Sequence, residues 1–170
     1  MLGILLIGLV ILQRLVELAV AKRNEKWIVS EGGYEVGAAH YPWMILLHSS
    51  FFIALLAEVL LVNPGISSIW GFLLPLFLLV QAARIWCLCS LGRFWNTKIM
   101  ILPHATIVKK GPYRIIRHPN YLVVTMELII LPLLLNAYFT AILFTLLNIW
   151  MLSVRIPVEE KALTKMTNNL

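Results

Sequence analysis

The sequence predicts an all-α protein: a polytopic transmembrane helical bundle of about five spans, the last two forming a helical hairpin. One observation is composition, because the 170 residues are 61% hydrophobic and 13% charged, and the mean hydropathy is +0.88. Soluble domains are about half apolar and about a quarter charged. Another is spacing: long apolar runs alternate with polar segments, and a membrane helix needs about 20 residues. A single domain over residues 1–170 is expected, which excludes multidomain, disordered and disulfide-stapled architectures.

Five apolar runs predict the spans in order. They cover residues 2–20, 41–62, 66–91, 121–135 and 138–154. Asn63-Pro64-Gly65 is a turn signal between the second and third runs, and the polar stretches 24–40 and 92–117 predict loops. The last two runs are each short for an independent span, so they predict a tight hairpin. Four spans with a re-entrant hairpin are the alternative, and this arrangement gives the same sidedness.

The basic residues predict which side of the membrane each loop occupies. Eleven of the 14 lysines and arginines lie in three segments, 22–26, 93–117 and 161–165. Five spans place all three segments on one side, which the positive-inside rule assigns to the cytoplasm. The C-terminus is then cytoplasmic and the N-terminus lies outside.

The net charge of +6 needs no nucleic-acid partner in such a protein. Basic residues beside membrane spans act as topology signals and contact anionic lipid head groups. Membrane lipids are therefore expected partners and nucleic acid is not. Cys87 and Cys89 lie two residues apart in an apolar run and face different sides of a helix, so no disulfide and no metal site is expected.

Ionisable residues within the apolar runs are candidates for functional roles, because charges are costly at membrane depth. Arg14 and Glu17 are three residues apart and can pair on one helix face. Glu127 needs a partner, and Arg84 is the candidate, although Arg84 can also extend to the interface. Glu58, near the outer end of the second run, is expected to reach water. The full set is Arg14, Glu17, Glu58, Arg84, Glu127 and Arg155, with His48 as a polar companion.

The densest polar motif spans residues 109–121 and predicts an anion site. Pro119 biases His118 away from the helical region and suits the first turn of the helix that follows. Arg117 and His118 then precede a helix N-terminus, where free N–H groups and the helix dipole favour a carboxylate or phosphate. The alternative is a basic loop that anchors the protein to the membrane, with its tyrosines in the aromatic belt.

A second polar motif follows the last apolar run. Arg155 lies four residues before Glu159, and Glu160 is adjacent, although Pro157 can interrupt the helix between them. Two carboxylates suit the amino group or hydroxyls of a polar ligand, and the alternative is a solvated helix end. Because the two motifs flank one hairpin, we expect them to lie together.

The run Gly111-Pro-Tyr-Arg-Ile-Ile-Arg-His-Pro-Asn-Tyr121, followed by a hydrophobic hairpin and Arg155-Ile-x-x-Glu-Glu160, resembles the isoprenylcysteine carboxyl methyltransferase family and related phospholipid methyltransferases. The resemblance covers roughly residues 75–163, which would form the cofactor-binding core behind N-terminal spans in residues 1–65. It implies an S-adenosyl-L-methionine-dependent methyltransferase whose active site faces the cytoplasm.

The N-terminal half is similar to a bacterial subgroup, the alkylpyrone O-methyltransferases of Bacillus-type bacteria. The similar segments are Arg14-Leu-Val-Glu-Leu18, Lys22-Arg-Asn-Glu25, Gly33-Tyr-Glu35 and His40-Tyr-Pro-Trp-Met44. This resemblance implies a bacterial cell membrane, a lipophilic small-molecule acceptor and a type III polyketide synthase as pathway partner. Family members commonly continue past the Glu-Glu pair with a longer tail, whereas this chain stops ten residues after Glu160, which favours a small lipid-like acceptor over a prenylated protein.

The resemblance also implies roles for individual residues. Arg155 and Glu159 would be catalytic, Arg155 by orienting the acceptor oxygen. The loop residues would lie along the cofactor largely through backbone contacts, and the two motifs would bind its methionine end, adenosine and polar groups. The implied cofactor-binding set is His104, Ile107, Val108, Gly111, Pro112, Tyr113, Arg117, His118, Pro119, Tyr121, Glu159 and Glu160.

The chemistry leaves some alternatives open. Methyl transfer from a sulfonium is an in-line displacement that needs alignment and a dry site more than acid–base catalysis. An acceptor that is already ionised, such as a carboxylate or acidic enol, needs no base, whereas a weaker acid makes His48 or Glu127 a candidate base. Two other functions are weighed: an NADPH-dependent membrane reductase, and a membrane scaffold without enzymatic activity.

Overall fold

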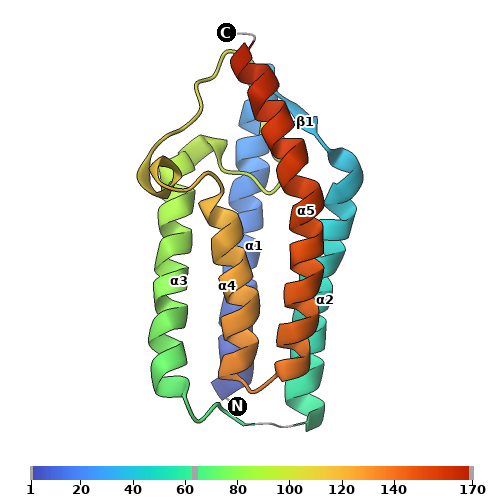
Figure 1. Ribbon diagram of the computed structural model, residues 1–170, viewed down its shortest axis with the longest axis vertical. Coiled ribbons are helices and arrows are strands. Elements are labelled where there is room, and N and C mark those ends of the chain that lie inside the picture. Colours follow the sequence, from blue (N-terminus) through green and yellow to red (C-terminus); the bar gives the residue numbers. More distant parts are fainter. Residues whose placement is uncertain (1, 63–64, 169–170) are drawn as a thin grey trace.

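The computed structural model describes residues 2–62 and 65–168 and consists of five helices that run in alternating directions along one long axis (Figure 1). The helices are α1 (Leu2–Ser30), α2 (Tyr41–Val62), α3 (Trp70–Leu91), α4 (Pro119–Leu134) and α5 (Tyr138–Asn168). The predicted all-α helical bundle is confirmed. Asn63 and Pro64 of the predicted turn lie outside the described residues, and α3 begins at Trp70 rather than at residue 66.

Four helices, α1, α2, α3 and α5, are long and apolar enough to cross a membrane. Their outer faces carry large apolar side chains that are open to the surroundings, such as Ile53 at 69% and Leu79 at 67% exposure. A soluble protein rarely exposes so much contiguous apolar surface, and a bilayer is the solvent that suits it. The bundle is therefore an integral membrane protein.

The α4–α5 hairpin forms as predicted, but its two arms differ in length. Helix α4 has 16 residues, about 24 Å at 1.5 Å per residue, which is shorter than the ~30 Å hydrocarbon core. Helix α5 has 31 residues, so the predicted end at residue 154 is wrong. It continues through Pro157, which lies inside the helix, because Arg155 and the turns around it pack against the loops and α4.

Helix α1 is also longer than predicted, since it runs to Ser30 and covers part of the expected loop 24–40. Tertiary hydrogen bonds account for the extension. The buried Asn24 amide donates to the carbonyl oxygens of Gly92 at 3.2 Å and Trp95 at 2.8 Å, and the Asn96 amide donates to the Ala21 carbonyl at 3.2 Å. These partners lie about 70 residues away and satisfy polar groups that would otherwise favour a loop.

A small antiparallel sheet, absent from the prediction, joins the two long polar segments. Strand β1 (Tyr34–Val36) pairs with β2 (Ile99–Ile101), with Glu35 opposite Met100. Three short 3₁₀ segments complete the polar region: η1 (Ala38–His40), η2 (Gly92–Phe94) and η3 (Gly111–Arg114). All these elements, and the C-terminal end of α5, lie at one end of the bundle (Figure 1). The three basic segments therefore share one end, as the sequence predicted.

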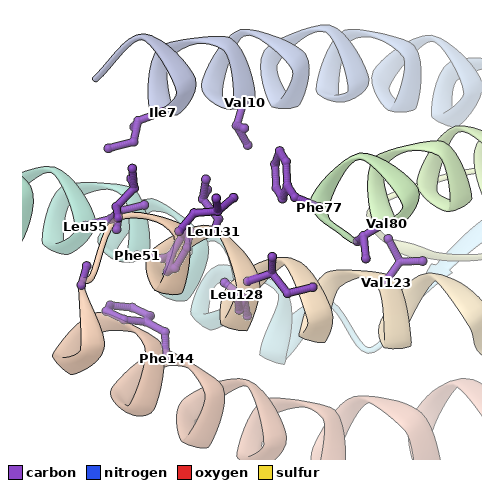
Figure 2. Close-up of a cluster of buried hydrophobic side chains, with 14 of the residues drawn as sticks. Ile7, Val10, Phe51, Leu55, Phe77, Val80, Val123, Leu128, Leu131 and Phe144 are labelled. Atoms are coloured by element: carbon purple, nitrogen blue, oxygen red, sulfur yellow. The ribbon is translucent and has the colours of Figure 1, made fainter. Parts of the chain in front are cut away.

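The hydrophobic core fills the middle of the bundle with side chains from all five helices (Figure 2). Phe51 on α2 and Phe144 on α5 meet edge to face, with ring centroids 5.5 Å apart. Leu131 on α4 and Ile7 on α1 are each 1% exposed. Core contacts pack the short α4 against the four long helices and set the position of its N-terminus along the bundle axis.

Glu58 was predicted to reach water. Instead, its side chain caps α5 at the end of the bundle opposite the loops. Its carboxylate accepts hydrogen bonds from the backbone N–H groups of Phe139 at 3.1 Å and Thr140 at 2.8 Å, and from the Thr140 hydroxyl at 2.6 Å. The first N–H groups of a helix have no partner within the helix, so this contact stabilises the start of α5.

Candidate functional site

A cavity of about 1090 Å³ lies toward the loop end of the bundle. Its polar end lies between the start of α4 and the last turns of α5, and its apolar end reaches Phe51 and Leu131 in the core. Small-molecule sites commonly measure about 300–1,000 Å³. The cavity therefore has room for a polar ligand together with part of a second one.

The polar end is built on the N-terminus of α4. His118 occupies the cap position in a non-helical conformation and Pro119 is in the first turn, so the predicted helix start is confirmed. Within the described residues, no side-chain hydrogen bond caps the free N–H groups at this helix start. The next residue, Asn120, lines the cavity, and its side-chain oxygen is buried without a hydrogen-bond partner in the described part of the chain. An unpaired buried acceptor costs about 1–3 kcal/mol, so this atom is suited to a ligand that donates a hydrogen bond.

Arg155 and Glu159 on α5 are joined to α4 through Tyr121. The Tyr121 hydroxyl donates to the Glu159 carboxylate and accepts from Nε of Arg155 at 2.7 Å. Arg155 is 4% exposed and also donates to the Thr97 carbonyl at 2.6 Å and to Sδ of Met44 at 3.0 Å. Three of its five N–H groups are used in this way, and three partners fix its orientation.

His118 brings the two sequence motifs together, as expected. Its ring stacks on that of Tyr121, with centroids 5.4 Å apart, and its Nε2 lies 3.4 Å from Oε1 of Glu160. Arg117 is 88% exposed at its side chain and lies 3.8 Å from the same carboxylate oxygen. Among the described residues, no group of three His, Cys, Asp or Glu side chains is placed to hold a metal ion.

The predicted loop residues divide into two groups. Ile107, Val108 and Tyr113 line the cavity, and burial raises the pKa of the Tyr113 hydroxyl, which is therefore neutral. The others lie outside the cavity wall: His104, Gly111, Pro112 and Pro119. His104 is exposed in a left-handed turn at φ 65°, and Pro112 and Pro119 are buried.

Gly111 has a packing role that accounts for its place beside the cavity. Its φ is 52°, and a Cβ there would lie 2.1 Å from Oγ of Ser90 on α3. A side chain is therefore excluded both by conformation and by space. The glycine lets η3 approach α3 closely, which positions the neighbouring Tyr113 at the cavity wall.

The floor of the cavity is a buried ionic network that links α1, α3 and α4. The predicted pairs form: Arg14 lies 2.6 Å from Glu17, and Arg84 lies 2.9 Å from Glu127. Each pair is also bridged to the other, since Arg84 lies 2.6 Å from Glu17 and Arg14 lies 2.9 Å from Glu127. Arg84 is 7% exposed, so the expectation that it extends to the interface is wrong.

Neither a motif nor a spacing in the sequence indicated the polar residues around this network and the site. Gln81 donates to Glu127 at 2.9 Å, and Thr97 holds Arg155 only through a backbone carbonyl, which any residue could supply. Met44 belongs to the segment His40–Met44 that carries the bacterial resemblance, and this was the one available pointer. Asn120 lies inside the first motif, where its type alone did not distinguish it.

The loop that carries Thr97 is held by Lys98. Its ammonium lies 2.8 Å from Glu25 at the end of α1 and 2.9 Å from Glu35 on β1. The hydrogen bonds to Glu25 and then to Glu35 raise the pKa of Lys98 above its usual range. This contact joins three segments at the loop end and thereby supports the carbonyl that orients Arg155.

The cavity also meets the outer surface of the bundle between α1 and α2. Leu15 and Leu18 on α1, and Ile45 on α2, line the cavity yet are 57%, 47% and 49% exposed. Side chains that are both exposed on the apolar flank and part of the cavity wall mark an opening toward lipid. A ligand with an alkyl tail can enter here without passing through water.

Fold and cavity together define an integral membrane protein with an interfacial site that is polar at one end and open to lipid at its side. Residues 72–165 match the isoprenylcysteine carboxyl methyltransferase (ICMT) family, and the chain belongs to this family. It is therefore a membrane methyltransferase, and the resemblance seen in residues 75–163 is confirmed.

Two curated relatives cover nearly the whole chain. One is the uncharacterized protein YpbQ of Bacillus subtilis (strain 168), 50% identical over 159 residues, or 94% of this chain and 95% of that protein. The other is an uncharacterized protein of Haemophilus influenzae, 28% identical over 152 residues, or 89% of this chain and 88% of that protein. No solved structure matches the chain significantly.

Proposed function

We propose that this protein transfers a methyl group from S-adenosyl-L-methionine to an oxygen atom of a lipophilic acceptor. The observation that carries the proposal is the cavity, which joins an oriented arginine and two glutamates at its polar end to an opening between apolar helices. A cofactor with charged groups suits the first part. An acceptor with an alkyl tail suits the second.

The residues at the polar end fit the charges of this cofactor. Its carboxylate suits the uncapped N-terminus of α4 with Arg117 beside it, and its ammonium suits Glu160 and Glu159. The unpartnered oxygen of Asn120 can accept a hydrogen bond from an amino group. When bound, the cofactor supplies a methyl group activated by a positively charged sulfur.

The protein's own residues then act by position. Arg155 is held by Tyr121, Thr97 and Met44. Two of its N–H groups have no partner among the described residues and can orient the acceptor oxygen. The surrounding helices exclude water, which strengthens such polar contacts. Glu159, fixed by the Tyr121 hydroxyl, keeps Tyr121 and the bound cofactor in register with Arg155.

The shape of the apolar end supports our proposal for the acceptor class. A ring hydroxyl on a long alkyl chain, as in alkylpyrones or alkylresorcinol-like lipids, matches both Arg155 and the opening between α1 and α2. Each buried CH₂ contributes roughly 0.8 kcal/mol, so affinity rises with tail length until the groove is full. The bacterial resemblance favours these lipids over isoprenylcysteine, together with a type III polyketide synthase as the source of the acceptor.

The proposal is tested with detergent-purified protein and radiolabelled S-adenosyl-L-methionine. We expect faster transfer to a long-chain alkylpyrone than to a farnesylcysteine analogue, because the acidic ring suits Arg155. Transfer to the farnesylcysteine analogue alone contradicts the acceptor but leaves the methyltransferase in place.

Calorimetry separates the rival functions. S-adenosylhomocysteine is expected to bind and NADPH is not, because Glu159 and Glu160 suit an ammonium group, which NADPH lacks. Binding of NADPH alone supports the membrane reductase. A chain that binds neither and retains its fold supports the scaffold without enzymatic activity.

We propose that the loop end faces the cytoplasm of a bacterial cell, because it gathers the basic segments. In a Cys89→Ser background, Lys110→Cys is expected to resist a membrane-impermeant maleimide in intact cells and to react after lysis. Ser68→Cys, exposed at the opposite end, is the matched control and is expected to react in intact cells. Labelling of Lys110→Cys in intact cells contradicts the proposed cytoplasmic location of the loop end.

A further inference from the structure

We infer that His48 is the general base of this site, and that the enzyme therefore methylates neutral phenolic hydroxyl groups as well as acceptors that are already ionised. The inference rests on the proposed function and names the acceptor class more closely. It starts from a side chain on α2 that lines the cavity and that cofactor binding does not use.

The hydrogen bond at His48 fixes which nitrogen can accept a proton. Nδ1 lies 2.8 Å from the carbonyl oxygen of Met44. A carbonyl oxygen can only accept, so Nδ1 carries the hydrogen and Nε2 of the neutral ring carries the lone pair. Within the described residues, no hydrogen bond uses Nε2. The ring is therefore held as a base at the cavity wall.

Met44 connects this base to the residue that orients the acceptor. Its carbonyl holds His48 and its sulfur accepts from Arg155 at 3.0 Å. Residues four apart on a helix lie about 5–6 Å from each other on one face. Met44 and His48 therefore lie one turn apart on the same face of α2, and His48 and Arg155 both line the cavity near Met44. An acceptor oxygen that passes its proton to Nε2 must lie about 3 Å from this nitrogen or be joined to it by one water molecule.

The other candidate bases already make contacts within the protein. The Glu127 carboxylate accepts hydrogen bonds from Arg14, Gln81 and Arg84, each at 2.9 Å. His118 stacks on Tyr121 and faces Glu160 at the cofactor end. Three of the roughly four lone-pair sites of the Glu127 carboxylate are therefore taken, and His118 lies away from the apolar part of the cavity.

The proposed step balances in atoms and charge. The acceptor oxygen forms a bond to the methyl carbon, its proton moves to Nε2 of His48, and the carbon–sulfur bond of the cofactor breaks with its electron pair left on sulfur. The single positive charge passes from the sulfonium to the imidazolium, which then releases its proton to water. Arg14 on α1, Glu127 on α4 and Arg155 on α5 are the charged groups that act on the ring electrostatically.

The test compares two acceptors in one variant. His48→Asn keeps an amide nitrogen near the position of Nδ1 and removes the base. We expect its kcat for an alkylresorcinol to fall roughly 10²- to 10⁴-fold, the usual contribution of a general base. Its kcat for an alkylpyrone, which ionises without help, is expected to stay near the wild-type value. Ser50→Ala is the control: Ser50 also bonds to the carbonyl four residues earlier but does not line the cavity.

The pH profile gives a second readout. With the alkylresorcinol, the wild-type rate is expected to rise with pH as the imidazole loses its proton and then to level off. The variant's rate continues to rise toward alkaline pH, because only the phenolate reacts. If His48→Asn loses kcat equally for both acceptors, or for neither, His48 is not the general base. In that case, transfer to the alkylpyrone by the wild-type protein still supports the proposed function. A wild-type protein that methylates neither lipid refutes the proposed function and this inference together.

Discussion

Replacing Arg84 with methionine is expected to lower the free energy of unfolding by about 3–5 kcal/mol, the usual effect of breaking a buried ion pair. The Arg84 guanidinium donates to both oxygens of Glu17 and to Glu127, at 2.6–3.0 Å. Without it, two carboxylates at the centre of the bundle share one remaining arginine, Arg14. The measurement is reversible unfolding in mixed detergent micelles, followed by circular dichroism.

Two further variants isolate the cause of this loss. Arg84→Met combined with Glu17→Gln leaves one arginine and one glutamate, so we expect the double variant to regain part of the lost stability. Arg23→Met, on the exposed end of α1, removes an arginine without a buried partner and is expected to change little. A loss at Arg84 that the second substitution does not relieve means that packing, and not charge balance, is responsible.

Replacing Arg155 with methionine is expected to lower kcat for a lipid acceptor roughly 10²- to 10³-fold, as when one oriented donor is removed from an active site. Arg155 is the donor that the structure holds most firmly at the junction of the polar and apolar ends. Cofactor affinity is expected to change far less, because the α4 N-terminus, Asn120 and Glu160 remain. Turnover of radiolabelled cofactor and calorimetric titration give the two values.

Arg155→Lys is the matched variant, since it keeps the charge and loses the planar group that contacts three partners at once. We expect Arg155→Lys to be at least as stable as Arg155→Met but to recover little of the lost turnover. If both substitutions weaken cofactor binding as much as turnover, Arg155 belongs to the cofactor pocket and does not orient the acceptor. A variant that turns over at the wild-type rate contradicts the catalytic assignment.

The sequence by itself determined the class of fold and the place of the site along the chain. Mean hydropathy and the spacing of apolar runs predicted a membrane bundle, because few other structures keep so many apolar residues out of water. Pro119 decided where α4 begins, through local backbone restriction. The i,i+3 pair of Arg14 and Glu17 was also local and therefore readable. The two motifs around the hairpin were brought together by connectivity alone.

The tertiary structure decided what depends on partners distant in sequence. Helix α1 extends to Ser30 because Asn24 bonds to residues about 70 positions away, and Glu58 caps a helix that begins 80 residues later. The four-way ionic network and the Thr97 carbonyl on Arg155 likewise follow from packing. So does the position of Nε2 of His48, which has no hydrogen-bond partner in the described part of the chain. Side-chain pairing across helices leaves no period or spacing in a single sequence, so only the folded bundle shows which polar groups are satisfied and which are left for a ligand.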